Sequence, residues 1–103
     1  MASPSSSAAL WALDEAGSLR LRQWDDEAVV YHRPSGATHL VDEVSALILR
    51  TLEQGAMSLA GLAARVGETL GVGSPEELEQ ITGERLAGLQ RLGIVVCLPG
   101  DHR

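Results

Sequence analysis

The chain has 103 residues and a formal charge of −6, and all eight of its basic residues are arginines. A chain of this length allows one domain with a modest core, which argues against a deep catalytic cleft between two lobes. An acidic chain is also a poor match for nucleic acid, because neutralised phosphates supply most of the affinity there.

The cellular setting follows from two features of the sequence. Cys97 is the only cysteine, so no internal disulfide can form, and a reducing compartment is the simplest interpretation. The first basic residue is Arg20, and no apolar run approaches the roughly 18–20 residues of a membrane span. We therefore predict a cytoplasmic protein that binds neither nucleic acid nor membrane, and no pattern indicates a cofactor.

The first part of the chain predicts a small sheet. Residues 1–9 are small and polar and should be disordered, whereas Leu10–Leu13 is apolar and should dock onto the domain or bind a partner. Leu19–Trp24 alternates apolar and polar residues, which indicates a strand with one wet face. An acidic turn, Asp25–Glu27, then leads into a second strand, Ala28–His32.

The next turn and strand complete an antiparallel meander. Proline at the second position and glycine at the fourth position of Arg33-Pro34-Ser35-Gly36 fit a type I turn. Thr38–Val41 follows as the third strand. Because this strand is short and last, one of its sides should present unpaired N–H and C=O groups.

Three helices are predicted after the meander. Asp42 can cap the first helix, which Gly55 should end, and Ser58 opens the second. The third runs from Pro75 to about Leu92 after a capping box. Its buried face is expected to carry Leu78, Ile81, Leu89 and Leu92, with Arg85 in the middle of that face.

The fold class is therefore α+β, a winged-helix-like domain in which a three-stranded antiparallel sheet is followed by three helices. The β-branched run Ile94–Leu98 leaves room for one more short strand. We place the domain at residues 10–98, between a tail at 1–9 and a tail at 99–103.

No catalytic or metal site is predicted. His32 and His39 lie on successive strands, and Asp25 or Asp42 could add an oxygen ligand, but nothing fixes a third ligand. Cys97 lies in an apolar run where it should be buried, without the electropositive setting that activates a thiol.

Arg85 admits two interpretations. A guanidinium in an apolar stripe must reach solvent, pair with an acid or line a groove. The acids within the chain that could pair with it are Glu43, Glu53 and Glu84. If Arg85 lines a groove instead, it could meet an acidic peptide.

Three stretches together resemble the PqqD family. These are Trp24–His32, the S-G-x-T-H-L-(L/V)-D motif at Ser35–Asp42, and Leu86–Leu92 leading into Gly93-Ile94-Val95. The chain is most similar to the branch named the HPr-rel-A system PqqD family peptide chaperone. The resemblance covers about residues 10–98, and it departs mildly from the pattern at Val41, where leucine is expected.

The resemblance implies a non-enzymatic module that holds a precursor peptide for a modifying enzyme, with a protein related to the HPr kinase as a further partner. In such domains the peptide adds as a strand to the sheet edge and packs against the third helix. The peptide-binding residues expected on this basis are Ala37, Thr38, His39, Leu40, Val41, Leu78, Arg85 and Leu89.

Two other functions stay open. A DNA-binding winged helix would need a basic recognition helix, yet Pro75–Leu92 carries four glutamates and two arginines, and acids facing phosphates repel. A structural subunit could instead dimerise through the exposed strand edge or through Leu10–Leu13.

Overall fold

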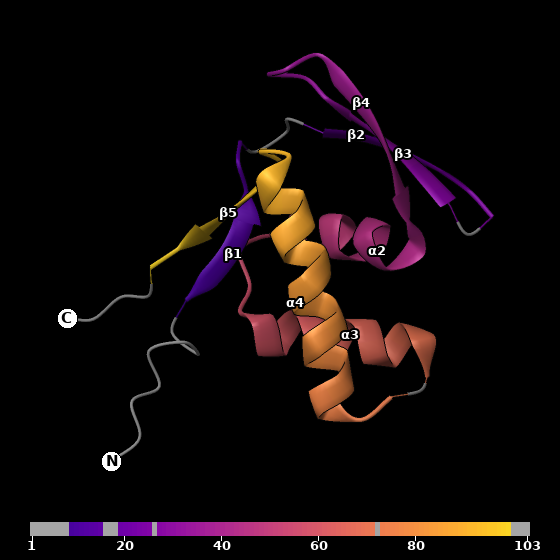
Figure 1. The fold of residues 1–103 in the computed structure, drawn as a ribbon, viewed down its shortest axis with the longest axis vertical. Helices are drawn as coiled ribbons and strands as arrows, with labels where there is room; N and C mark the ends of the chain where they lie inside the picture. The colour runs from indigo at the N-terminus through magenta and orange to yellow at the C-terminus, as the bar shows by residue number, and fades with distance from the viewer. Residues whose placement is uncertain (1–8, 16–18, 26, 72, 100–103) are drawn as a thin grey trace.

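The computed structural model describes residues 9–15, 19–25, 27–71 and 73–99 (Figure 1). Most of the predicted tail at 1–9 and most of the tail at 99–103 lie outside these residues, as does one residue of the acidic turn. The elements in chain order are β1 (Leu10–Leu13), β2 (Leu19–Trp24), β3 (Glu27–His32), β4 (Ala37–Asp42), α2 (Glu43–Leu52), α3 (Leu59–Leu70), α4 (Pro75–Arg91) and β5 (Val95–Leu98).

The three-stranded antiparallel meander is confirmed, with the strand order β2-β3-β4. Strand β3 is central, and its alternate residues Ala28, Val30 and His32 are buried. This is the period-two alternation of a sheet with one face on the core. Strand β4 is one residue longer at each end than predicted, because Ala37 pairs with His32 and Asp42 pairs with Glu27.

The turn between β3 and β4 has the predicted chemistry. The Gly36 N–H donates to the Arg33 carbonyl at 3.2 Å and to the His32 carbonyl at 2.8 Å, and Gly36 has a φ of +72°, which favours glycine. The Ser35 hydroxyl also lies 2.9 Å from His32 Nδ1 and accepts from the Ala37 N–H at 3.2 Å. These bonds hold the start of β4 against the end of β3.

A second, two-stranded sheet joins the two ends of the domain. Leu10–Leu13 docks, as predicted, but it does so as strand β1, which pairs antiparallel with β5. The Trp11 N–H and C=O also bond to Met57, at 2.8 and 3.0 Å. Cys97 was predicted to be buried and is exposed, because among the described strands β5 pairs only with β1 and its last residues face solvent.

Each helix begins at the cap that the sequence predicts. The side chains of Asp42 and Ser58 accept from the backbone N–H three residues further on, at 2.9 and 3.1 Å. Ser74 and Glu77 form the reciprocal capping box. Helix α2 ends at Leu52, three residues before the predicted Gly55.

The core is aliphatic and is closed by α4, which packs against α2 and α3. The prediction of which residues form the buried face of α4 was partly wrong. Its buried residues are Thr82, Leu86 and Leu89, spaced by four and three residues, whereas Leu92 is 45% exposed. Leu78 and Ile81 are half-buried.

Candidate functional site

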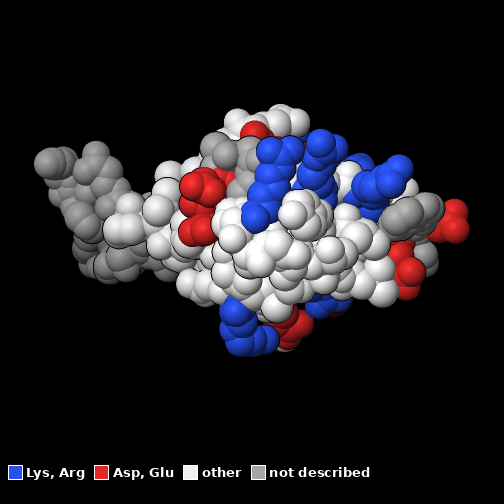
Figure 2. All heavy atoms as spheres, turned by 90° about the horizontal axis from the view of Figure 1, so that it is seen from above, with Lys and Arg blue, Asp and Glu red and all other residues white. Residues whose placement is uncertain are grey.

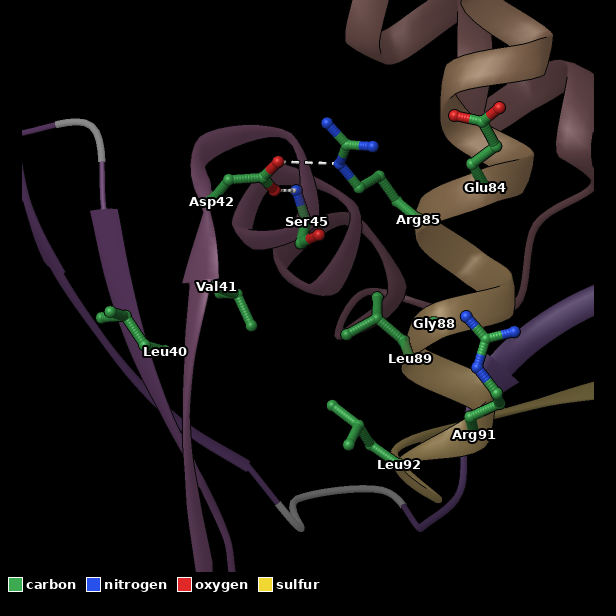
Figure 3. A pocket seen from close by; sticks show the side chains of 10 residues that line it. All are labelled: Leu40, Val41, Asp42, Ser45, Glu84, Arg85, Gly88, Leu89, Arg91 and Leu92. Carbon is green, nitrogen blue, oxygen red and sulfur yellow. Dashed lines mark hydrogen bonds and ion pairs between the residues drawn. The ribbon is translucent and has the colours of Figure 1, made fainter.

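A groove separates the outer strand β4 from the C-terminal half of α4, and its volume is about 440 Å³ (Figure 3). Strand β4 and the start of α2 form one wall, and α4 forms the other. The lining residues are Leu40, Val41, Asp42, Ser45, Glu84, Arg85, Gly88, Leu89, Arg91 and Leu92.

Strand β4 contributes an open sheet edge to this groove. Among the described residues it pairs only with β3, so alternate backbone N–H and C=O groups point away from the sheet on its other side. Val41 lies on the side of β4 that faces α4, whereas Leu40 points the opposite way (Figure 3) and is 66% exposed. An extended chain could therefore bond to β4 and place alternate side chains toward α4.

The helical wall of the groove is apolar. Leu89 and Leu92 both point from α4 toward β4 (Figure 3). Leu89 is anchored in the core, whereas Leu92 keeps much of its surface free. Together with Val41 they form an apolar centre that a ligand side chain could cover.

Asp42 and Arg85 close one end of the groove with an ion pair. Arg85 Nε donates to Asp42 Oδ2 at 2.7 Å, while Asp42 Oδ1 accepts from the Ser45 N–H at 2.9 Å. The prediction that Glu43, Glu53 or Glu84 pairs with Arg85 was therefore wrong. Its partner is Asp42, which lies at the end of β4 and also caps α2. Arg85 both lines the groove and has an internal partner.

The pKa of Asp42 reflects these contacts. Partial burial opposes ionisation, but hydrogen bonds from the Ser45 amide and side chain and the bond and charge of Arg85 outweigh it, so the pKa lies below its ordinary value of 3.8. A depressed pKa in the folded state means that ionised Asp42 stabilises the fold above pH ~3.8, and that this stabilisation is lost as the pH falls through the folded value.

We expect Asp42→Ala to lower the free energy of unfolding by about 1 kcal/mol at pH 7, through loss of the cap. The difference from wild type should shrink as the pH falls below ~3.8, because protonation removes the charge in the wild type too.

Asp42→Asn is the matched variant, since asparagine also caps a helix. It should lose only the stabilisation from the ion pair with Arg85, which is under about 1 kcal/mol for a half-exposed pair. Urea unfolding at neutral and acidic pH measures both. A difference that grows at acidic pH would contradict the assignment.

The structure brings together only part of the predicted peptide-binding set. Leu40, Val41, Arg85 and Leu89 line the groove, and Ala37, Thr38 and His39 continue the same edge strand beyond it. Leu78 does not line it. Leu78 lies about 10 Å further along the helix axis than Arg85, where it packs against Gly67 and Gly73 of the α3–α4 corner.

Sequence reasoning missed Asp42, Ser45, Glu84, Gly88, Arg91 and Leu92 as lining residues. The sequence contained a signal for two of them, Gly88 and Leu92. Arg85, Gly88, Leu89 and Leu92 stand at spacings of three and four residues, which places them on one helix face.

A second hollow of about 470 Å³ lies beside the start of α4, lined by Leu70, Gly73, Glu77, Leu78, Gln80 and Ile81. Its volume is no smaller than that of the groove. However, its lining comes from helices and their connection, whose backbone groups are largely bonded within each helix. The groove beside β4 is therefore the better site for an extended ligand.

Other candidate chemistry finds little support in the described part of the chain. His32 is buried and bonded to Ser35, and His39 lies opposite Val30. No group of three His, Cys, Asp or Glu residues is placed to hold a metal ion there. No described helix is long and apolar enough to cross a membrane.

Figure 2 shows several arginine side chains close together along one side of the molecule. Independently of that view, Arg20 and Arg22 are exposed on β2, opposite Tyr31 and Val29 of β3. These two arginines lie on the sheet and not on α4, the helix that a DNA-binding winged helix would use for recognition.

Two solved structures share this fold. TbiB1 in complex with the TbiA(beta) leader peptide matches with a TM-score of 0.63 and 19% sequence identity, over 82% of this chain and 93% of that one. Lasso peptide synthetase B1 complexed with the leader peptide matches with a TM-score of 0.62 and 20% identity, over 84% of this chain and 96% of that one. No protein-family model and no curated protein sequence matches the chain. The chain therefore has the fold of these two peptide-bound proteins along nearly their whole length.

Proposed function

We propose that this protein is a non-enzymatic peptide-binding module, which takes up an extended peptide as an added strand on β4 and packs it against α4. The observation that carries the proposal is the open edge of β4 facing the apolar side chains of Leu89 and Leu92 across the groove. Backbone hydrogen bonds along such an edge supply affinity for any extended chain. Pockets for alternate side chains supply specificity.

The nature of the peptide is inferred from similarity. Both structures with the same fold contain a leader peptide, and the Ser35–Asp42 motif resembles the PqqD family. We infer that the ligand is the leader of a precursor peptide, which residues 10–98 hold in the cytoplasm for a modifying enzyme. A protein related to the HPr kinase is a further proposed partner, and self-association through the β4 edge would compete with the peptide.

Nuclear magnetic resonance of the labelled protein tests the site. The probe is a synthetic peptide selected from a random peptide library on the wild-type protein. We expect backbone amide shifts in β4, at Ala37–Val41, and along α4 from Glu84 to Leu92. Shifts confined to Leu59–Leu70 would reject the groove, and a library without binders would reject peptide binding itself.

Two further measurements separate this function from its rivals. A gel shift with mixed duplex DNA at low salt should show no complex, because the chain is acidic. The assay is sensitive, since even non-specific DNA binding is strong at low salt. Size-exclusion chromatography at two protein concentrations detects a dimer. If the dimer uses the β4 edge, adding the peptide should dissociate it.

A further inference from the structure

Gly88 has no packing reason to be glycine. It lies inside α4, where glycine lowers stability relative to alanine because it gives up more backbone freedom. Apart from its neighbours in the helix, no heavy atom in the described ranges lies within 4 Å of a Cβ built at this position. A methyl group at this position therefore meets no other part of the domain.

Two other helical glycines have an evident reason. A Cβ at Gly67 would lie 2.6 Å from Leu78 Cδ1, and a Cβ at Gly61 would lie 2.8 Å from Met57 Cγ. Both distances are shorter than real Cβ contacts, so a side chain at either position would require Leu78 or Met57 to move. Gly88 differs from them because a Cβ there would meet no neighbouring atom and because Gly88 lines the groove.

We propose that Gly88 is a contact point for the bound peptide, where a large apolar side chain of the peptide lies directly on the backbone of α4. The proposal rests on the peptide-binding function proposed above. Val41 and Leu89 line the same groove, and Gly88 precedes Leu89 on the helical wall (Figure 3). A methyl group at Gly88 would occupy the volume that the ligand needs.

The charges of the lining indicate the chemistry of this side chain. Asp42 and Glu84 are balanced by Arg85 and Arg91, and Arg85 is already held by Asp42. The groove therefore has no excess charge to select an acidic or basic residue. Its apolar centre favours an uncharged, apolar side chain, whose burial is the main source of specificity.

The test compares Gly88→Ala with Gly83→Ala. Gly83 is the matched control, because it also lies in α4, does not line the groove, and would meet only Leu59 Cδ1 at an ordinary 4.0 Å. Both substitutions should raise Tm by about 2–8 °C, since alanine is the better helix former. Only Gly88→Ala should weaken binding of the library-selected peptide, by about tenfold through overpacking.

A second measurement uses the peptide. Selecting the same library on the Gly88→Ala protein should yield peptides with a smaller side chain at the anchor position, and these should bind the variant at least as well as the wild type.

The outcomes separate the two proposals. Equal affinity of the Gly88→Ala protein and the wild type, with binding still weakened by Leu92→Glu, would overturn the role of Gly88 and leave peptide binding in place. Equal loss of affinity in Gly83→Ala would also overturn it. If no library peptide binds the wild type, both proposals fall.

Discussion

Leu92→Glu is expected to weaken peptide binding by about thirtyfold or more. Leu92 points into the groove while keeping 45% of its surface exposed, so the free protein has little need of it, whereas a bound peptide would cover it. A carboxylate there would have to give up its water when the peptide binds, and losing such a central apolar contact costs about 2 kcal/mol or more. Isothermal titration with the library-selected peptide measures the effect.

Leu98→Glu is the control for this substitution. Leu98 is exposed to a similar extent, 41%, but it lies on β5, outside the groove. Both variants add one negative charge to the chain, so long-range electrostatic effects are matched. Both should lose no more than about 1 kcal/mol of stability, as half-exposed positions do. Equal weakening by the two variants would argue against the groove as the binding site.

The largest effect on stability is expected for Leu86→Ala. Leu86 is completely buried in the cluster where α4 meets α2 and α3. Removing its side chain forfeits apolar burial and leaves a cavity, which together cost roughly 2–5 kcal/mol in well-packed cores. That is a large part of the 5–15 kcal/mol typical of a whole domain. Chemical denaturation at neutral pH measures the shift in midpoint.

Leu40→Ala serves as the comparison, because Leu40 is the most exposed large apolar side chain of the described residues. Its free energy of unfolding should change by no more than about 0.5 kcal/mol. A loss below about 1 kcal/mol for Leu86→Ala would mean that α4 is not packed as described. A groove built on α4 would then lose its rigid wall.

The local elements of the fold could be predicted because their causes are local. The alternation in β2 and β3, the Pro34-Gly36 turn and the caps at Asp42, Ser58 and Ser74 depend on residues within a few positions of each other. The prediction was weaker where partners are distant in sequence. The pairing of Leu10–Leu13 with Val95–Leu98 joins the two ends of the domain, and no short-range pattern encodes it.

The candidate site shows the same division. Its edge strand was predicted from the position of Thr38–Val41 at the end of the meander, and helix periodicity brought Arg85 and Leu89 to one face. The periodicity also included Leu78, which packs against Gly67 and Gly73 instead. A helix face extends along the whole axis, and only the packing of α2 and α3 against α4 decides which part of that face meets β4.

By itself, the sequence determined the strands of the meander, the helix starts and the edge of β4, because backbone preferences and caps act between near neighbours. Only the tertiary structure decided that Asp42 forms an ion pair with Arg85, that Leu92 is partly exposed, and that a Cβ at Gly88 would meet no neighbouring atom. These features depend on the distance between β4 and α4, whose paired residues Asp42 and Arg85 are 43 positions apart in the chain. That distance is set by the packing of the whole core.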